Sequence, residues 1–307
     1  MNRNLLDVDE LDPGRLTRIL DQAAAGRRDP STIPQVLAGL GAAAVFEKPS
    51  ARTRTSFEMA VVALGGHPVI LHADEVQMGK CESVADVART LACYCAVIAA
   101  RVFDHDNLVA MTAAVDVPIV NLLSDRAHPL QALADLLTLR DHLGGLDGRR
   151  VAFIGDGNNV AASLAYGAAL CGLEVVVASP AGYELPDAVI DRARNLGGAV
   201  EQVADPYEAA KGADALYTDV WTSMGQEDEG AARRAAFAGY TVDDALLAAA
   251  NPGACFLHCL PAHRGEEVSA SVIDGPASVV WDQAANRLHA ARALLADLLD
   301  TDPNGNG

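Results

Sequence analysis

Short apolar segments alternate with longer amphipathic segments along the first half of the chain. Short apolar runs predict β-strands, and apolar positions three and four residues apart predict α-helices. Strands are expected at residues 42–46, 67–71, 96–101 and 118–121. Helices are expected at residues 11–25, 52–64, 84–95, 108–114 and 128–142. This alternation of strand and helix indicates a parallel sheet covered by helices.

The alternation begins again after Gly148. Strands are expected at residues 151–154, 174–178, 215–218 and 255–258, and helices at 160–171, 187–196 and 284–299. The last helix has an apolar stripe and is expected to pack back on a domain. We therefore predict an α/β fold of two domains, each a parallel sheet flanked by helices, joined by interdomain helices. The first domain comprises residues 1–142 with the C-terminal helix 285–307, and the second comprises residues 143–284.

Composition excludes several classes of protein. Half of the 307 residues are hydrophobic and about a fifth are charged, so each domain can bury a core without disulfides. The net charge of −18 repels nucleic acid and anionic membranes, so an anionic substrate needs a local group of arginines. The six cysteines have no paired spacing, the N-terminus has no apolar signal core, and no apolar run approaches a membrane span. We expect a reduced, cytoplasmic protein with no nucleic-acid or membrane partner.

The first candidate site is the segment Ser50-Ala51-Arg52-Thr53-Arg54-Thr55, which follows a strand and opens a helix. A helix N-terminus offers free backbone N–H groups and a partial positive charge, and Ser50 is a suitable cap. The hydroxyl and guanidinium groups add donors that match phosphate oxygens. The pattern is not that of a nucleotide P-loop. It indicates a phosphate site, or alternatively a capped helix with solvent-facing arginines.

His128 and Gln131 lie at a second strand-to-helix junction. Three residues apart, they share one helix face, and both can form hydrogen bonds to a carbonyl or an amide. The alternative is a histidine that only caps the helix.

The loop Gly155–Asn159 resembles a dinucleotide-binding turn. Val160 replaces the third glycine, and Ser179 stands where an acidic residue would bind ribose. Asn158 and Asn159 instead offer amides to an amino-acid carboxylate or amine. Alternatively, they only form a turn.

Two later strands end in the segments Asp219–Gly225 and His258–Gly265. A zinc site of His258, Cys259 and His263 is disfavoured, because no second cysteine cluster has ligand spacing. Cys259 could also be a nucleophile with His258 or His263 as its base. Adjacent strand residues face opposite sides, which disfavours His258 in that role. All these loops follow predicted strands, where open α/β sheets bind ligands.

Together these residues resemble the carbamoyltransferase family and, within it, the ornithine branch. The resemblance covers essentially the whole chain, in the order Ser50–Arg54, Gln77, Arg101, His128–Gln131, Asn159, Asp219–Gly225, His258–Pro261 and Arg287. The Ser-Met-Gly and His-Cys-Leu-Pro segments mark the ornithine branch. Ala51 departs from the family, which often has threonine there, but the backbone N–H remains and phosphate binding is expected to persist.

The resemblance implies a role for each matched residue. The phosphate of carbamoyl phosphate would be held by Ser50, Ala51, Arg52 and Thr53. Its carbamoyl group would be held by Arg101, His128 and Gln131, with Gln77 contributed by a neighbouring subunit of a homotrimer. Cys259 and Leu260 would line the reacting centre, and Arg287 would complete it. L-ornithine would be bound by Asn159, Asp219, Ser223 and Met224.

The implied reaction transfers the carbamoyl group to the δ-amine of L-ornithine, giving L-citrulline and phosphate in arginine biosynthesis. Arginines and His128 would stabilise the negative charge that grows on the carbonyl oxygen and the phosphate. Neither a cofactor nor a metal is implied. The alternatives are another acceptor such as putrescine or an N-acylated ornithine, a non-catalytic paralogue, and a dehydrogenase, which Val160 and Ser179 disfavour.

Overall fold

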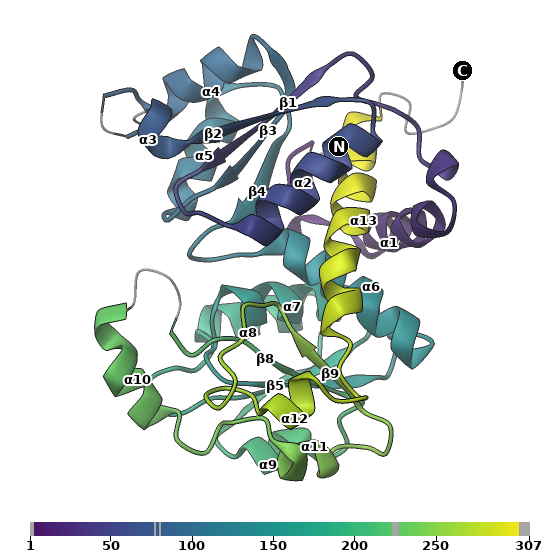
Figure 1. The fold of residues 1–307 in the computed structure, drawn as a ribbon, viewed down its shortest axis with the longest axis vertical. Coiled ribbons are helices and arrows are strands. Elements are labelled where there is room, and N and C mark those ends of the chain that lie inside the picture. The colour runs from purple at the N-terminus through teal and green to yellow at the C-terminus, as the bar shows by residue number, and fades with distance from the viewer. Residues whose placement is uncertain (1–2, 77, 80, 223–226, 301–307) are drawn as a thin grey trace. The chain divides into compact units, whose positions relative to one another are not determined.

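Two parallel β-sheets organise the chain, one in each of two units (Figure 1). The computed structural model describes residues 3–76, 78, 79, 81–222 and 227–300. Unit 1 comprises Met1–Leu133 and Asn286–Gly307, and unit 2 comprises Ala134–Ala285. Each sheet is flanked by helices, which confirms the predicted fold class. Among the described residues, no helix has the length and apolar character that a bilayer crossing requires.

Unit 1 is built on a four-stranded sheet in the order β2-β1-β3-β4. The strands are β1 (Gly41–Phe46), β2 (His67–His72), β3 (Cys95–Arg101) and β4 (Ile119–Leu123). The helices are η1 (Val8–Glu10), α1 (Pro13–Arg28), η2 (Pro30–Thr32), α2 (Ala51–Ala63), α3 (Ala73–Val76), α4 (Val84–Ala92) and α5 (His105–Ala114). Unit 1 also contains the start of α6 (Pro129–Leu143) and most of α13 (Val280–Leu299).

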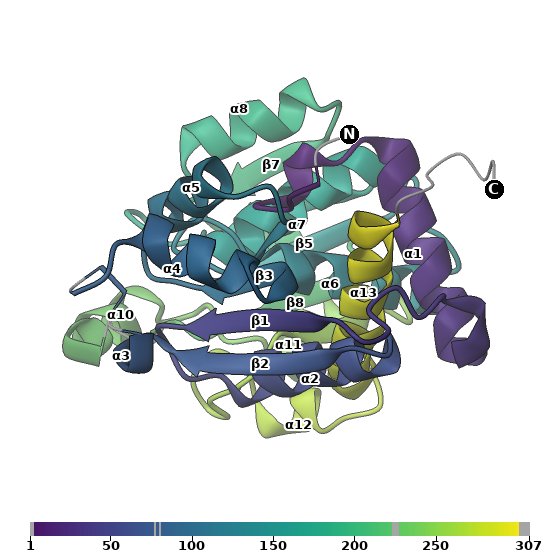
Figure 2. The same ribbon diagram turned by 90° about the horizontal axis from the view of Figure 1, so that it is seen from above.

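Alternate strand residues of unit 1 face opposite sides of the sheet. Ala43 and Val45 of β1 pack with Ile98 of β3 in one apolar cluster, which also contains residues of α4 and α5. Helix α2 lies on the other face (Figure 2). Since both faces are covered, these strands are apolar along almost their whole length.

Unit 2 has a five-stranded sheet in the order β7-β6-β5-β8-β9. The strands are β5 (Arg150–Ile154), β6 (Glu174–Ala178), β7 (Val200–Val203), β8 (Ala215–Thr218) and β9 (Cys255–His258). The helices are α7 (Asn159–Cys171), α8 (Asp187–Asn195), α9 (Pro206–Ala210), η3 (Glu227–Glu229), α10 (Gly230–Ala236), α11 (Asp244–Ala248) and α12 (Ala270–Ile273). Helices α7 and α8 cover one face, while α9, α11 and α12 cover the other (Figure 1).

The predicted elements differ from the observed ones in two respects. The helix expected at 84–95 ends at Ala92, because the N–H of Tyr94 bonds the Leu91 carbonyl only three residues earlier and Cys95 already pairs with β1. Strand β7 and helices α3 and α9 to α12 were not predicted. These elements are four to seven residues long, too short for periodicity to identify them.

Each sheet has a topological switch point, where ligands bind in open α/β sheets. In unit 1 the switch point lies between β1 and β3, and in unit 2 it lies between β5 and β8. Ser50 follows β1, and Arg101 ends β3. Asn158 follows β5, and Asp219 follows β8. The topology therefore gathers these residues at the carboxyl ends of the two strands that flank the switch point of each sheet.

Gly157 allows two backbone segments to approach closely beside the unit 2 switch point. A Cβ there would lie 2.2 Å from Leu185 N and 2.4 Å from the carbonyl carbon of Glu184. We expect Gly157→Ala to lower the free energy of unfolding by ~1–3 kcal/mol through overpacking, measured by urea denaturation. Gly14→Ala is the control, since its Cβ would approach only side-chain atoms, Asp12 Oδ1 at 3.1 Å and Arg18 Nη1 at 3.9 Å, and no backbone atom as close as those at Gly157. Equal stability of the two variants would contradict this account.

Candidate active site

Helix α2 begins directly after β1, and Ser50 caps it. The Ser50 Oγ accepts a hydrogen bond from the Thr53 N–H at 3.3 Å, as predicted for a cap. The first N–H groups of a helix have no acceptor within the helix, so they are suited to an anion. Arg52 is half-buried at this end, whereas Arg54 is exposed and pairs with Glu58 at 2.9 Å. The predicted motif therefore divides into a helix-start part and a surface ion pair.

Two arginines from different elements converge on Thr53. Arg101 Nη1 of β3 donates to Thr53 Oγ1 at 3.4 Å, and Arg287 Nη2 of α13 donates to the same oxygen at 2.9 Å. Arg287 Nη1 also donates to Gln131 Oε1. All four side chains are buried. Two guanidinium groups at one hydroxyl repel each other, and an anion bound beside them would relieve that repulsion.

His128 lies in the same part of unit 1. Burial lowers the pKa of His128 well below its usual value, and the nearby positive charges of Arg287 and Arg101 lower it further. The ring is therefore neutral at neutral pH and can donate a hydrogen bond without carrying charge. The His128 carbonyl accepts the N–H groups of Gln131 and Ala132, so the backbone of this residue, as distinct from its ring, begins α6.

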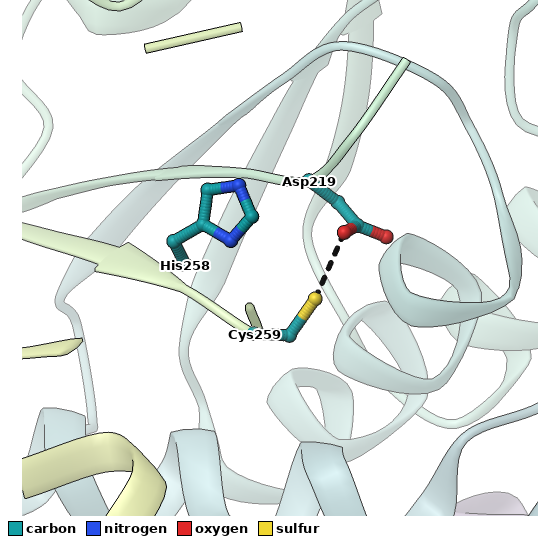
Figure 3. Close-up of side chains that lie close together, drawn as sticks. All are labelled: Asp219, His258 and Cys259. Atoms are coloured by element: carbon teal, nitrogen blue, oxygen red, sulfur yellow. Dashed lines mark hydrogen bonds between the residues drawn. The ribbon is translucent and has the colours of Figure 1, made fainter. Parts of the chain in front are cut away.

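In unit 2 the Asp219 carboxylate is the centre of the candidate site. Cys259 Sγ donates to Asp219 Oδ1 at 2.9 Å, and Asn158 Nδ2 donates to Asp219 Oδ2 at 2.9 Å. Figure 3 shows the Cys259 side chain pointing toward this carboxylate. The Val220 N–H also donates to Oδ1 at 2.8 Å. The carboxylate is thus fixed in position by groups from three different loops.

Asn158 has a second contact, because its Oδ1 accepts the N–H groups of Val160 and Ala161 and so caps α7. Asn159, the predicted ligand, is the first residue of α7 and is half-buried. The predicted residues Gln77, Ser223 and Met224 lie outside the described residues. Leu260 is described and has a left-handed backbone with φ 61°.

His258 uses both ring nitrogens in contacts with its own unit. Its Nδ1 accepts the Leu260 N–H at 2.8 Å, and its Nε2 lies 3.1 Å from Glu267 Oε1. An Nδ1 that accepts a hydrogen bond leaves the proton on Nε2, which donates to the carboxylate. The ring therefore has no lone pair left to take the Cys259 proton, in agreement with the sequence argument.

The ligand atoms of Asp219, His258 and Cys259 lie within 4.8 Å of one another (Figure 3). His263 instead groups with Glu266 and Glu267. Since His258 Nδ1 and Nε2 are both engaged, the first group does not offer three available ligand atoms. His258, Cys259 and His263, the zinc candidates of the sequence analysis, therefore do not form one tetrahedral ligand set.

Arg233 supports the segment that follows Asp219, and sequence reasoning missed it. Its Nη1 donates to Asp156 Oδ2 at 2.8 Å and to the Trp221 carbonyl at 2.9 Å, and its Nε donates to Glu229 Oε2 at 3.0 Å. Burial raises the pKa of Asp156, while Arg233 opposes that shift. Arg233 lies on a helix of seven residues. Such a helix is too short for its hydrophobic periodicity to show which of its arginines is buried.

Comparison with known proteins identifies the family. A family model described as the carbamoyl-P binding domain of aspartate/ornithine carbamoyltransferase matches residues 3–141. A second model, described as the Asp/Orn binding domain of the same enzymes, matches residues 147–298. The chain belongs to the aspartate/ornithine carbamoyltransferase family. It is therefore a carbamoyltransferase, as the sequence resemblance predicted.

Individual relatives of this carbamoyltransferase support the same assignment. It is 55% identical over 304 residues to the ornithine carbamoyltransferase of Acidothermus cellulolyticus, covering 98% of this chain and 97% of that one. Its structure resembles that of the ornithine carbamoyltransferase from Thermus thermophilus, with a TM-score of 0.89, 48% identity, and coverage of 97% and 99%. For the enzyme from Pyrococcus furiosus the TM-score is 0.91, with 45% identity and 96% of each chain covered.

The lowered pKa of His128 makes stability depend on pH. The folded protein resists protonating this ring, so the unfolded chain binds more protons once the pH falls below about 6.5, and stability is lost there. Between about pH 7.5 and 5.5 this site should account for about 1.4 kcal/mol of lost unfolding free energy. We expect the unfolding free energy of His128→Gln, measured with urea, to fall correspondingly less over this pH range.

His67→Gln is the matched control, because His67 is exposed at the start of β2. It should retain the pH dependence of the unmodified protein. An equal loss of stability in all three proteins would show that His128 is not held neutral.

Proposed function

We propose that this carbamoyltransferase transfers the carbamoyl group of carbamoyl phosphate to the δ-amine of L-ornithine, producing L-citrulline and phosphate, in arginine biosynthesis in the cytoplasm. The observation that carries the proposal is the convergence of Arg101 and Arg287 on Thr53 at the start of α2. Such a convergence suits a doubly charged phosphate group. The similar proteins from Acidothermus cellulolyticus and Thermus thermophilus are ornithine carbamoyltransferases, which supports ornithine as the acceptor.

Residues of unit 1 would bind the carbamoyl phosphate. Ser50, Ala51, Arg52 and Thr53 would hold the phosphate through side chains and through the first backbone N–H groups of α2. Arg101, His128 and Gln131 would bind the carbamoyl group, and Arg287 would bridge both parts. A neutral His128 is a hydrogen-bond donor to the carbonyl oxygen, where negative charge grows in the transition state.

Residues of unit 2 would bind the amine. The Asp219 carboxylate, fixed by Asn158 and Cys259, is complementary to a cationic amino group, and Asn159, Ser223 and Met224 would complete the contacts to ornithine. The protonated δ-amine first loses one proton to solvent. The neutral amine then forms the new N–C bond, the bond from carbon to the phosphate oxygen breaks, and phosphate leaves with that electron pair and accepts the second amine proton. Cys259 orients the amine in this scheme and forms no covalent bond.

The domain assignment follows from these roles. Residues 1–142 with the C-terminal helix 285–307 would form the carbamoyl-phosphate domain, and residues 143–284 would form the ornithine domain. The descriptions of the two matching family models support this division.

The decisive measurement is product formation from carbamoyl phosphate with four acceptors compared side by side. We expect turnover with L-ornithine and none with putrescine, N-acetylornithine or aspartate, because only ornithine presents a free α-amine, an α-carboxylate and a δ-amine together. Turnover with another amine would retain the phosphate site and overturn the ornithine assignment. No turnover with any of the four would favour a non-catalytic role.

A paired substitution in the same assay tests the arginine convergence. Arg101→Met should lower turnover by ~10²–10³-fold, the usual cost of removing one group that stabilises transition-state charge. Arg54→Met is the control, since Arg54 is exposed and paired with Glu58, and it should retain the original rate. Equal rates for the two variants would remove the basis of the proposal.

We also propose that the chain forms a homotrimer in which Gln77 contributes to a neighbouring subunit's site. Large apolar side chains exposed in unit 1 support an interface there, namely Leu40, Met59, Val62, Tyr94, Phe103 and Val109. Sedimentation equilibrium should give three times the chain mass of 32.0 kDa, or a multiple of that value. A fully active single chain would contradict the proposal.

A further inference from the structure

A buried ring of hydrogen bonds in unit 2 connects β8, β9, α6 and α13. Asp135 of α6 accepts from Tyr217 OH of β8 at 3.0 Å and from Gln283 Nε2 of α13 at 2.7 Å. Gln283 Oε1 in turn accepts the backbone N–H of His258 in β9 at 2.9 Å. Cys259, the next residue, donates to Asp219 and so closes the ring.

The ring lies where the paired part of two strands ends. Strands β8 and β9 are in register from Ala215 and Cys255 up to Thr218 and His258. Asp219 and Cys259 are the next pair in that register, where no backbone pairing holds them. Strand β9 is the edge strand, so the outward N–H of His258 needs an acceptor from outside the sheet, and Gln283 provides it. The side-chain ring therefore continues the connection between the strands beyond their last backbone pair.

Every side chain on the Asp135 side of the ring is removed from solvent. Asp135 and Tyr217 are 0% exposed and Gln283 is 1% exposed. Burial raises the pKa of Tyr217 well above its usual value, and the charges of Asp135, Cys259 and Asp219 raise it further, so its hydroxyl keeps the proton that it donates. A buried donor that loses its acceptor is costly. Loss of the Asp135 carboxylate would therefore leave two donors unsatisfied unless the strands shifted.

We propose that Asp135 is a positioning residue for the reaction, which holds the Asp219 carboxylate and the Cys259 thiol in register through Tyr217 and Gln283. The inference rests on the proposed function, because that pair is where the amine would bind. Asp135 touches neither substrate in this account. Its effect on the reaction passes through the ends of β8 and β9.

Two substitutions of Asp135 distinguish whether its hydrogen bonds or its negative charge matter to the ring. In Asp135→Asn the amide oxygen can still accept from Gln283, and the amide NH₂ can donate to the Tyr217 hydroxyl, which then accepts. Asp135→Leu has a similar volume but can do neither. The proposal therefore expects Asn to rescue what Leu loses.

The experiment compares Asp135→Leu, Asp135→Asn and Thr138→Val. Thr138 is the matched control, since it is buried on the same helix and its hydroxyl donates to the Ala134 carbonyl at 2.7 Å. Two quantities are measured, namely the steady-state constants with ornithine and carbamoyl phosphate, and the iodoacetamide alkylation rate of the Cys259-containing peptide by mass spectrometry. Urea unfolding corrects each comparison for stability.

For Asp135→Leu we expect kcat with ornithine to fall by ~10–100-fold, as when a reacting group is misplaced, with the KM for carbamoyl phosphate unchanged. Alkylation of Cys259 should become faster, because a thiol that no longer donates to a carboxylate loses its proton more readily. Asp135→Asn should restore both quantities, and Thr138→Val should change neither. The proposal would be overturned if folded Asp135→Leu kept the kcat and the Cys259 alkylation rate of the unmodified protein. It would also be overturned if Thr138→Val changed both quantities as much as Asp135→Leu does.

If Asp135→Leu does not fold, Tyr217→Phe and Gln283→Met each remove one arm of the ring. Their combined effect on alkylation should differ from the sum of the single effects, as expected for residues of one network. Additive effects would contradict the ring. The alkylation rate needs no substrate, so it tests the positioning role even where ornithine is not the acceptor, and the two proposals can fail separately.

Discussion

Both sheets are covered by helices on their two faces, and this constraint determines where chemistry is possible. A parallel strand buried on both sides is mostly apolar, so most polar side chains enter where a strand ends. Arg101, Asp219 and Cys259 all stand at or directly after the carboxyl end of a strand. Each is buried or half-buried there, so each needs partners from neighbouring loops and helices. The hydrogen-bonded clusters of both units follow from this requirement.

The two units meet the requirement with opposite charges. Unit 1 gathers two guanidinium groups around Thr53, although the chain as a whole carries a net charge of −18. Unit 2 places a carboxylate, Asp219, among neutral donors from Asn158 and Cys259. A local field of either sign is effective in a buried site because screening by water and salt is weak there. The positive site of unit 1 suits an anionic ligand, and the negative site of unit 2 suits a cationic one.

Sequence patterns predicted the strands that carry the site and the cap of α2, because these depend on local rules. Ser50 precedes a helix and caps it, and the strand before it is a continuous apolar run. The patterns could not identify partners that are distant in sequence. Arg233 meets Asp156 across 77 residues, and Asp135 meets Gln283 across 148. Such pairs depend on how helices pack on a sheet, and a buried arginine or aspartate has no signature of its own in a single sequence.

Helices α6 and α13 each supply one residue to the hydrogen-bonded cluster of unit 1 and another to that of unit 2. Gln131 and Asp135 are four residues apart on α6, and Gln283 and Arg287 are four apart on α13. Gln131 bonds Arg287 in unit 1, while Asp135 bonds Gln283 in unit 2. A recombination event that exchanged one unit between two relatives would have to cut both helices between these residues and preserve both matches. Exchanging either unit alone would therefore put both hydrogen-bonded clusters at risk, although each unit has its own sheet and core.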